Sequence, residues 1–134
     1  MNNMNAIDVL RPIVDEGNSL AAAEMFLDND LGGQCVGIRF VFSDKQIFVH
    51  VEGTDDSICV LRTPPATLSD ESIRREPAPA EWASAIGQPA LWAWTMTNTQ
   101  GRVDGVQIEF GTVEHPSITI QAVVRASTLA LRAL

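Results

Sequence analysis

Apolar and polar residues alternate through most of residues 19–62, which is the pattern of β-strands with two different faces. Ile38, Phe40 and Phe42 fall on one side of the second run while Val41 lies on the other, which suits a strand that is largely covered on both sides. The connections between the runs are short and rich in Ser, Asp and Gly, as in hairpin loops. We therefore predict a four-stranded antiparallel meander. Its strands occupy 19–28, 34–44, 46–53 and 57–62.

In the third of these runs the alternation separates aliphatic side chains from a histidine. Ile47, Val49 and Val51 face one way, and Phe48 and His50 face the other. His50 is therefore expected on the same sheet face as Phe48.

The first residues have the spacing of a short helix. Asn5 is a suitable N-cap, Leu10 and Val14 lie one turn apart, and Gly17 is a stop signal. Pro12 lies inside this segment, where it removes a backbone donor and crowds the preceding turn. We expect a helix of about ten residues with a kink or a break at Pro12.

Residues 63–81 interrupt the strand pattern with a Pro-rich, charged connection, which holds four of the seven prolines. Because long structureless loops are uncommon inside compact domains, we expect Ser69 to cap a helical turn over 70–75. An extended Pro-Ala-Pro segment follows, and 79–87 reads as a short helix that ends at Gly87.

The last third returns to strands at 90–98, 102–110 and 117–125. Residues 126–134 fit either a helix by composition or a strand by alternation, and we predict a strand. The predicted fold class is α+β, with a mostly antiparallel sheet of seven to eight strands, an N-terminal helix and short helical turns in the middle. A length of 134 residues predicts a single domain, 1–134.

Composition excludes several functional classes. Seventeen acidic residues against nine basic ones give a net charge of −8. Binding to nucleic acid or to an anionic membrane depends on clustered Lys and Arg, so neither partner is expected. The N-terminus lacks the pattern of a signal peptide, and no apolar run approaches the roughly 18 to 20 residues that span a bilayer. We predict a cytoplasmic protein.

The chain offers no recognisable catalytic motif, and we expect neither a metal nor a cofactor. Histidine and cysteine lack the spacing of a zinc site. Cys35 or Cys59 could pair with His50 as a nucleophile and base, but free cysteines within apolar strands are usually buried core residues. The lack of these motifs therefore favours a non-catalytic protein over an enzyme.

Two carboxylates, Asp104 and Glu109, lie within residues 97–110, which form the most patterned stretch of the chain. They are five positions apart, so on a strand they point to opposite faces about 16 Å apart and cannot form a catalytic pair. Asp104 follows turn-forming residues and is assigned to the turn. Gln107 and Glu109 are assigned to the face opposite the apolar Val106, Ile108 and Phe110.

The three tryptophans lie close together in sequence. Trp82 is on the short helix, and Trp92 and Trp94 share one face of the strand that follows. Aromatic side chains usually build cores, and we expect these to do so. An exposed tryptophan would instead mark a binding surface.

Residues 81–110, with their Trp, Asn and Gly positions and the pattern Asp-Gly-x-Gln-x-Glu-Phe at 104–110, resemble a family of small bacterial proteins catalogued only as a domain of unknown function. The resemblance implies a bacterial cytoplasmic source and carries over no activity.

Two functions remain open. The first is a non-catalytic protein-interaction module, for instance of inhibitor or immunity type, whose sheet face or Pro-rich loop binds a basic protein or a second copy of itself as a homodimer. The second is a small-ligand-binding protein or enzyme with a pocket between the sheet and residues 63–87 as a lid. The candidate binding residues for these two functions are Glu81, Trp82, Trp92, Trp94, Asp104, Gln107, Glu109 and His50.

Overall fold

A computed structural model describes residues 5–53, 55–112 and 114–134, without the side chains of 115–117. The helical elements are α1 (Ala6–Asp15) and the 3-10 helices η1 (Asn29–Leu31), η2 (Ala66–Ser69) and η3 (Ala80–Ala85). The strands are β1 (Leu20–Asp28), β2 (Gln34–Phe42), β3 (Gln46–Glu52), β4 (Ser57–Leu61), β5 (Ile73–Pro77), β6 (Ala90–Thr97), β7 (Val103–Thr112), β8 (His115–Arg125) and β9 (Thr128–Ala133).

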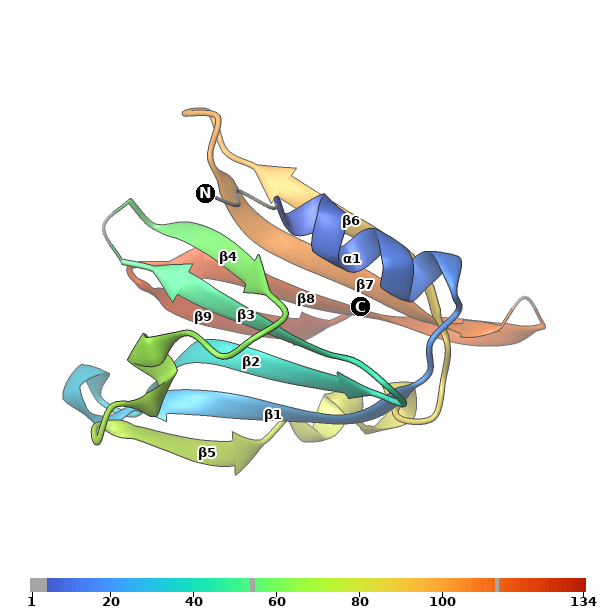
Figure 1. Cartoon of the computed structure of the whole chain (residues 1–134), viewed down its shortest axis with the longest axis horizontal. Coiled ribbons are helices and arrows are strands. Elements are labelled where there is room, and N and C mark those ends of the chain that lie inside the picture. The colour runs from blue at the N-terminus through green and yellow to red at the C-terminus, as the bar shows by residue number, and fades with distance from the viewer. Residues whose placement is uncertain (1–4, 54, 113) are drawn as a thin grey trace.

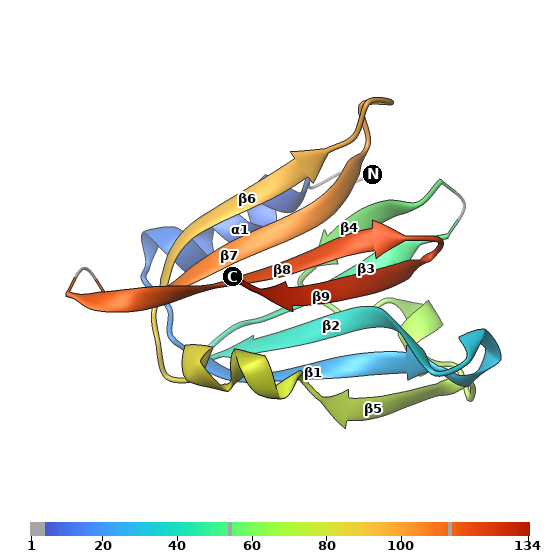
Figure 2. The ribbon, with the colours of Figure 1, turned by 180° about the vertical axis from the view of Figure 1, so that it is seen from behind.

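The strands form two antiparallel sheets, in the orders β4-β3-β2-β1-β5 and β6-β7-β8-β9. The two sheets lie in separate layers, and α1 lies in the layer of the first sheet, where it contacts β4 and packs over β6 (Figure 1). On the opposite side η3 extends the second layer beyond β9, next to β1 (Figure 2). The predicted α+β class is confirmed, whereas the division into two sheets was not predicted.

The main core fills the space between the layers. The predicted alternation is confirmed, because the inward positions of β2 and β7 are at most 3% exposed. The rings of Phe42 and Phe110 stack across the layers at 6.4 Å. Burying one such side chain stabilises the fold by about 1.5–3 kcal/mol. The two rows consist of Ile38, Phe40 and Phe42 and of Val106, Ile108 and Phe110.

Helix α1 begins at the predicted cap, where the Asn5 side chain accepts a hydrogen bond from the Asp8 backbone N–H at 3.0 Å. The predicted length of about ten residues is confirmed, and of the two alternatives at Pro12, a kink or a break, the break is wrong, because one helix runs from Ala6 to Asp15. Pro12 removes the backbone bond to Asp8, but Leu10 and Ile13 are buried against the sheets and hold the helix in place.

The predicted helical turn over 70–75 is also wrong. Residues Ile73–Pro77 form β5, which pairs antiparallel with β1 from Asp28 to Glu24. This pairing satisfies backbone groups along an otherwise open edge of β1, and that benefit outweighs the local preference for a turn. A short helical turn does occur nearby, in η2, and the predicted short helix after Pro79 is confirmed as η3.

The predicted strand at the C-terminal end is confirmed as β9. It follows β8 through Ala126 and Ser127, whose φ angles are 50° and 66°. Two successive residues with positive φ make the tight turn that suits the twist of an antiparallel hairpin.

Trp82 of η3 closes the core on the side of β9. It is 1% exposed, its ring stacks on Phe40 at 5.8 Å, and its indole N–H donates to the Arg132 carbonyl at 3.0 Å. The predicted core position of this tryptophan is confirmed.

We expect Trp82→Ala to lower the free energy of unfolding by about 3–5 kcal/mol, because it leaves a large cavity and an unpaired carbonyl. Trp92→Ala is the matched control, since that side chain is 61% exposed, and it should change the free energy by less than about 1 kcal/mol. Urea denaturation of both variants measures the difference. Equal losses in the two variants would contradict the placement of Trp82.

Candidate functional site

Trp92 and Trp94 lie on the outer face of the second sheet, away from the core. Their exposed fractions are 61% and 43%, so the expectation that they build the core is wrong. The reason lies on the other face of β6, where α1 packs closely. The small Ala90 and Ala93 occupy that inner face and leave no room for an indole.

The register of β6 and β7 brings together several predicted residues. Trp94 pairs with Gln107, and Trp92 pairs with Glu109. The predicted placement of Gln107 and Glu109 opposite the core row of β7 is confirmed, and both are half-buried. We call this surface the tryptophan face. It consists of Trp92, Trp94, Met96, Gln107, Glu109 and Gln121.

The centre of the tryptophan face is ordered by side-chain contacts between the strands. Gln121 of β8 donates a hydrogen bond from Nε2 to Gln107 Oε1 at 3.0 Å, and the same nitrogen lies 4.0 Å from Met96 Sδ. Gly105 lets Met96 lie flat on β7, because a Cβ on Gly105 would be 2.4 Å from Met96 Cε. The tryptophan face therefore combines an apolar strip along β6 with a row of polar side chains on β7 and β8.

Asp104 is not the turn residue that the sequence predicted. It lies in β7 as the extra residue of a bulge, since Met96 pairs with Gly105 while Thr97 pairs with Val103. The turn is held by Asn98, whose side-chain oxygen accepts from the backbone N–H groups of Gln100 and Arg102 at 2.9 and 3.2 Å. Asp104 and Asn98 are both short polar residues, and only the register of β6 against β7 decides which of them caps the turn.

The other candidate binding residues do not lie on the tryptophan face. Glu81 is exposed on η3, and Trp82 is in the core. His50 lies on the outer face of the first sheet and lines a cavity of about 290 Å³ between that sheet and the connection around η2. A cavity thus exists near the predicted place, but Gln107 and Glu109 are on the tryptophan face and do not converge with His50.

His50 is paired with Cys59 across β3 and β4, so one of the considered nucleophile–base pairs is close in space. Burial raises the pKa of the Cys59 thiol, and the nearby carboxylates of Glu52 and Asp55 raise it further. Burial also raises the pKa of Cys35 to about 11. Both thiols stay protonated at neutral pH, so neither is an activated nucleophile.

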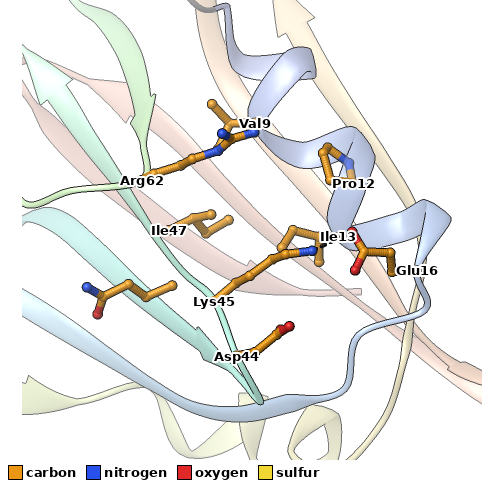
Figure 3. Close-up of a pocket in the computed structure, with 9 residues that line it drawn as sticks. Val9, Pro12, Ile13, Glu16, Asp44, Lys45, Ile47 and Arg62 are labelled. Carbon is orange, nitrogen blue, oxygen red and sulfur yellow. Dashed lines mark hydrogen bonds and ion pairs between the residues drawn. The ribbon is translucent and has the colours of Figure 1, made fainter.

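Another cavity, of about 520 Å³, lies between α1 and the turn from β2 to β3. Lys45 extends across it to form an ion pair with Glu16, while Arg62 extends toward Val9 (Figure 3). Ile13 and Ile47 give it an apolar wall. The sequence did not reveal this cavity, because its lining comes from separate elements and contains no motif.

Within the described residues, no three His, Cys, Asp or Glu side chains come together in a way that could hold a metal ion. In the same part of the chain, no helix has the length and apolar character needed to cross a membrane.

Fold and surface together define a small two-layer α+β protein whose tryptophan face is not covered by any element of the described residues. The model of a family described as "Family of unknown function (DUF6334)" matches residues 4–134, and the chain belongs to that family. The resemblance noted for residues 81–110 therefore extends over almost the whole chain. Searches of curated proteins and of solved structures found no match.

We expect His50 to make stability depend on pH. Burial lowers its pKa below the ordinary value of 6.5, so the imidazole is neutral in the folded protein. The unfolded chain takes up a proton near pH 6.5 while the folded protein does not. The stability that depends on neutral His50 is therefore fully present above about pH 6.5 and declines as the pH falls toward the folded pKa.

Urea denaturation between about pH 7.5 and about pH 5 checks this expectation against His50→Gln, which does not titrate. The unfolding free energy of the wild-type protein should fall more steeply below pH 6.5 than that of the variant. Parallel profiles would contradict a lowered pKa at His50.

Proposed function

We propose that this protein is a non-catalytic protein-interaction module and that its contact surface is the tryptophan face. The observation that carries the proposal is the exposure of Trp92 and Trp94, at 61% and 43%, side by side on a sheet face that no other element covers among the described residues. Tryptophan is strongly enriched among the residues that dominate binding energy at protein interfaces.

The energetics support a partner on this surface. Covering the exposed part of one indole removes on the order of 100 Å² from water, which stabilises a complex by about 2.5 kcal/mol. Gln107 and Gln121 already hold each other in position by the 3.0 Å hydrogen bond, so their remaining polar atoms are presented in a fixed geometry. A fixed surface loses little conformational entropy on binding.

The net charge of the protein favours a basic partner protein. The net charge of −8 disfavours an acidic partner and speeds the approach of a basic one. An inhibitor or immunity protein that binds a basic protein in the cytoplasm is one form of such a module. Small size, acidity and the unactivated thiols support this form.

Cross-linking in the cells that make the protein tests the proposal. A photoreactive amino acid in place of Gln107 should give adducts with a contacting chain, because this position lies beside Trp94. The same amino acid in place of Leu31, which is 42% exposed on η1, is the control. Adducts at 107 that disappear with Trp92→Ser support the proposal. Adducts at neither position, or equally at both, would contradict it.

A second function has one specific observation in its favour, the cavity of about 290 Å³ beside His50. A small molecule bound there should raise the melting temperature by mass action. We expect any such ligand, found by a thermal-shift screen of metabolites and metal ions, to lose its effect in Thr67→Trp, because Thr67 lines the cavity. A ligand that stabilises both proteins equally binds somewhere else.

A further inference from the structure

The cavity of about 290 Å³ beside His50 gathers acidic side chains from three separate places in the chain. Asp28 ends β1, Glu52 ends β3, and Asp70 follows η2. No lysine or arginine lines this cavity within the described ranges. Its potential is therefore negative, whereas the larger cavity beside α1 is lined by charges of both signs.

These carboxylates do not converge on one point. Among the described residues, no group of three or more His, Cys, Asp or Glu side chains could hold a metal ion. Apolar side chains lie among the acids in the lining, and they include Val36, Leu68 and Ile73. The cavity is thus suited to a ligand with an apolar body and not to a bare divalent cation.

His50 gives an independent indication of what the cavity binds. It is 8% exposed, and its Nδ1 lies 3.1 Å from the Val51 carbonyl oxygen. A carbonyl oxygen only accepts, so Nδ1 carries the proton of the neutral ring and Nε2 is an acceptor. Burial lowers the pKa of His50 and keeps the ring neutral. In the part of the chain that the structure describes, no donor is bonded to Nε2, and His50 lines the cavity.

A hydroxyl group adds a further acceptor to the lining. Ser127 donates its hydroxyl hydrogen to the Asp56 carboxylate at 2.9 Å, so its oxygen has only lone pairs left for a ligand. Carboxylates, an imidazole nitrogen and a hydroxyl oxygen thus all present acceptors to one cavity. A ligand that matches this lining has to supply the donors.

We infer that the cavity beside His50 binds a small organic amine, in which ammonium groups are joined by a short aliphatic chain. The inference rests on the second function proposed above and names the class of its ligand. An ammonium group has three N–H donors and no acceptor, so it complements the acceptors of the lining. The aliphatic chain contacts the apolar side chains between the acids. The net charge of −8 also draws a cation toward the protein.

Isothermal titration calorimetry of the full chain with putrescine, a four-carbon diamine, tests the inference. A salt concentration of about 150 mM screens diffuse attraction to the acidic surface. Butanediol of the same chain length is the matched neutral ligand, because it keeps the apolar body and lacks the charges. Charge-assisted hydrogen bonds are stronger than neutral ones, so we expect putrescine to bind at least about tenfold more tightly than the diol.

Substitutions locate the bound amine. Asp70→Asn should weaken putrescine binding about tenfold, because it removes a charged acceptor from the lining. Glu71→Gln is the matched control, since it removes the same charge from the next residue, which is exposed and outside the lining. It should change the affinity by less than about twofold.

A second variant tests the imidazole acceptor. His50→Phe keeps an aromatic ring and removes Nε2, so it should weaken putrescine binding about threefold to tenfold. Because His50 is buried, this variant could lose stability through the ring alone. Asp70 is exposed, so Asp70→Asn keeps the test decisive in that case.

Putrescine that does not bind, or that binds no more tightly than butanediol, overturns the inference. Equal losses in Asp70→Asn and Glu71→Gln also overturn it, because they indicate attraction to the whole acidic surface. The proposed functions fail separately. A neutral or anionic ligand whose effect is lost in Thr67→Trp would keep the cavity as a ligand site without an amine. Cross-links at position 107 test the tryptophan face independently of either result.

Discussion

The packing of α1 onto the inner face of β6 is the contact on which the rest of the structure depends. The first sheet and α1 form one layer, and β6 to β9 form the other, so the core reaches the edge of the second sheet only because α1 covers it. A helix needs small residues beneath it to approach a strand, and β6 supplies Ala90 and Ala93. The large residues of the same strand are then confined to the other face. The exposure of Trp92 and Trp94 is thus a consequence of how the core is closed.

Local sequence patterns were sufficient to predict the elements that depend only on residues close together in the chain. The alternation in β2 and β7 gave the correct core faces, because each side chain on a strand has only two directions to choose from. Asn5 gave the start of α1, and the alternation in 128–133 gave β9. These predictions needed no knowledge of which strands are neighbours.

The predictions that were wrong depended on distant parts of the chain. Ile73–Pro77 became a strand because β1 had an open edge beside it, and the sequence of the segment contains no sign of that edge. Asp104 became a bulge residue because the register of β6 against β7 left it unpaired, while Asn98 took the turn. Trp82 and Trp92 were both expected in the core, but η3 turns Trp82 into the core and β6 turns Trp92 toward solvent. Tertiary contacts decided each of these cases.

The outer faces of the two sheets differ in how far the described chain covers their aromatic side chains. On the first sheet the chain covers its own aromatic residues, since Leu68 of η2 packs in a cluster with Phe26 and Phe48. Gly37 makes this cover possible, because a Cβ there would lie 3.0 Å from both methyl carbons of Leu68. The second sheet carries larger aromatic side chains on its outer face, yet the described chain provides no comparable cover. The fold thus shields Phe26 and Phe48 with its own connection and leaves Trp92 and Trp94 exposed, and the proposed contact surface rests on this difference.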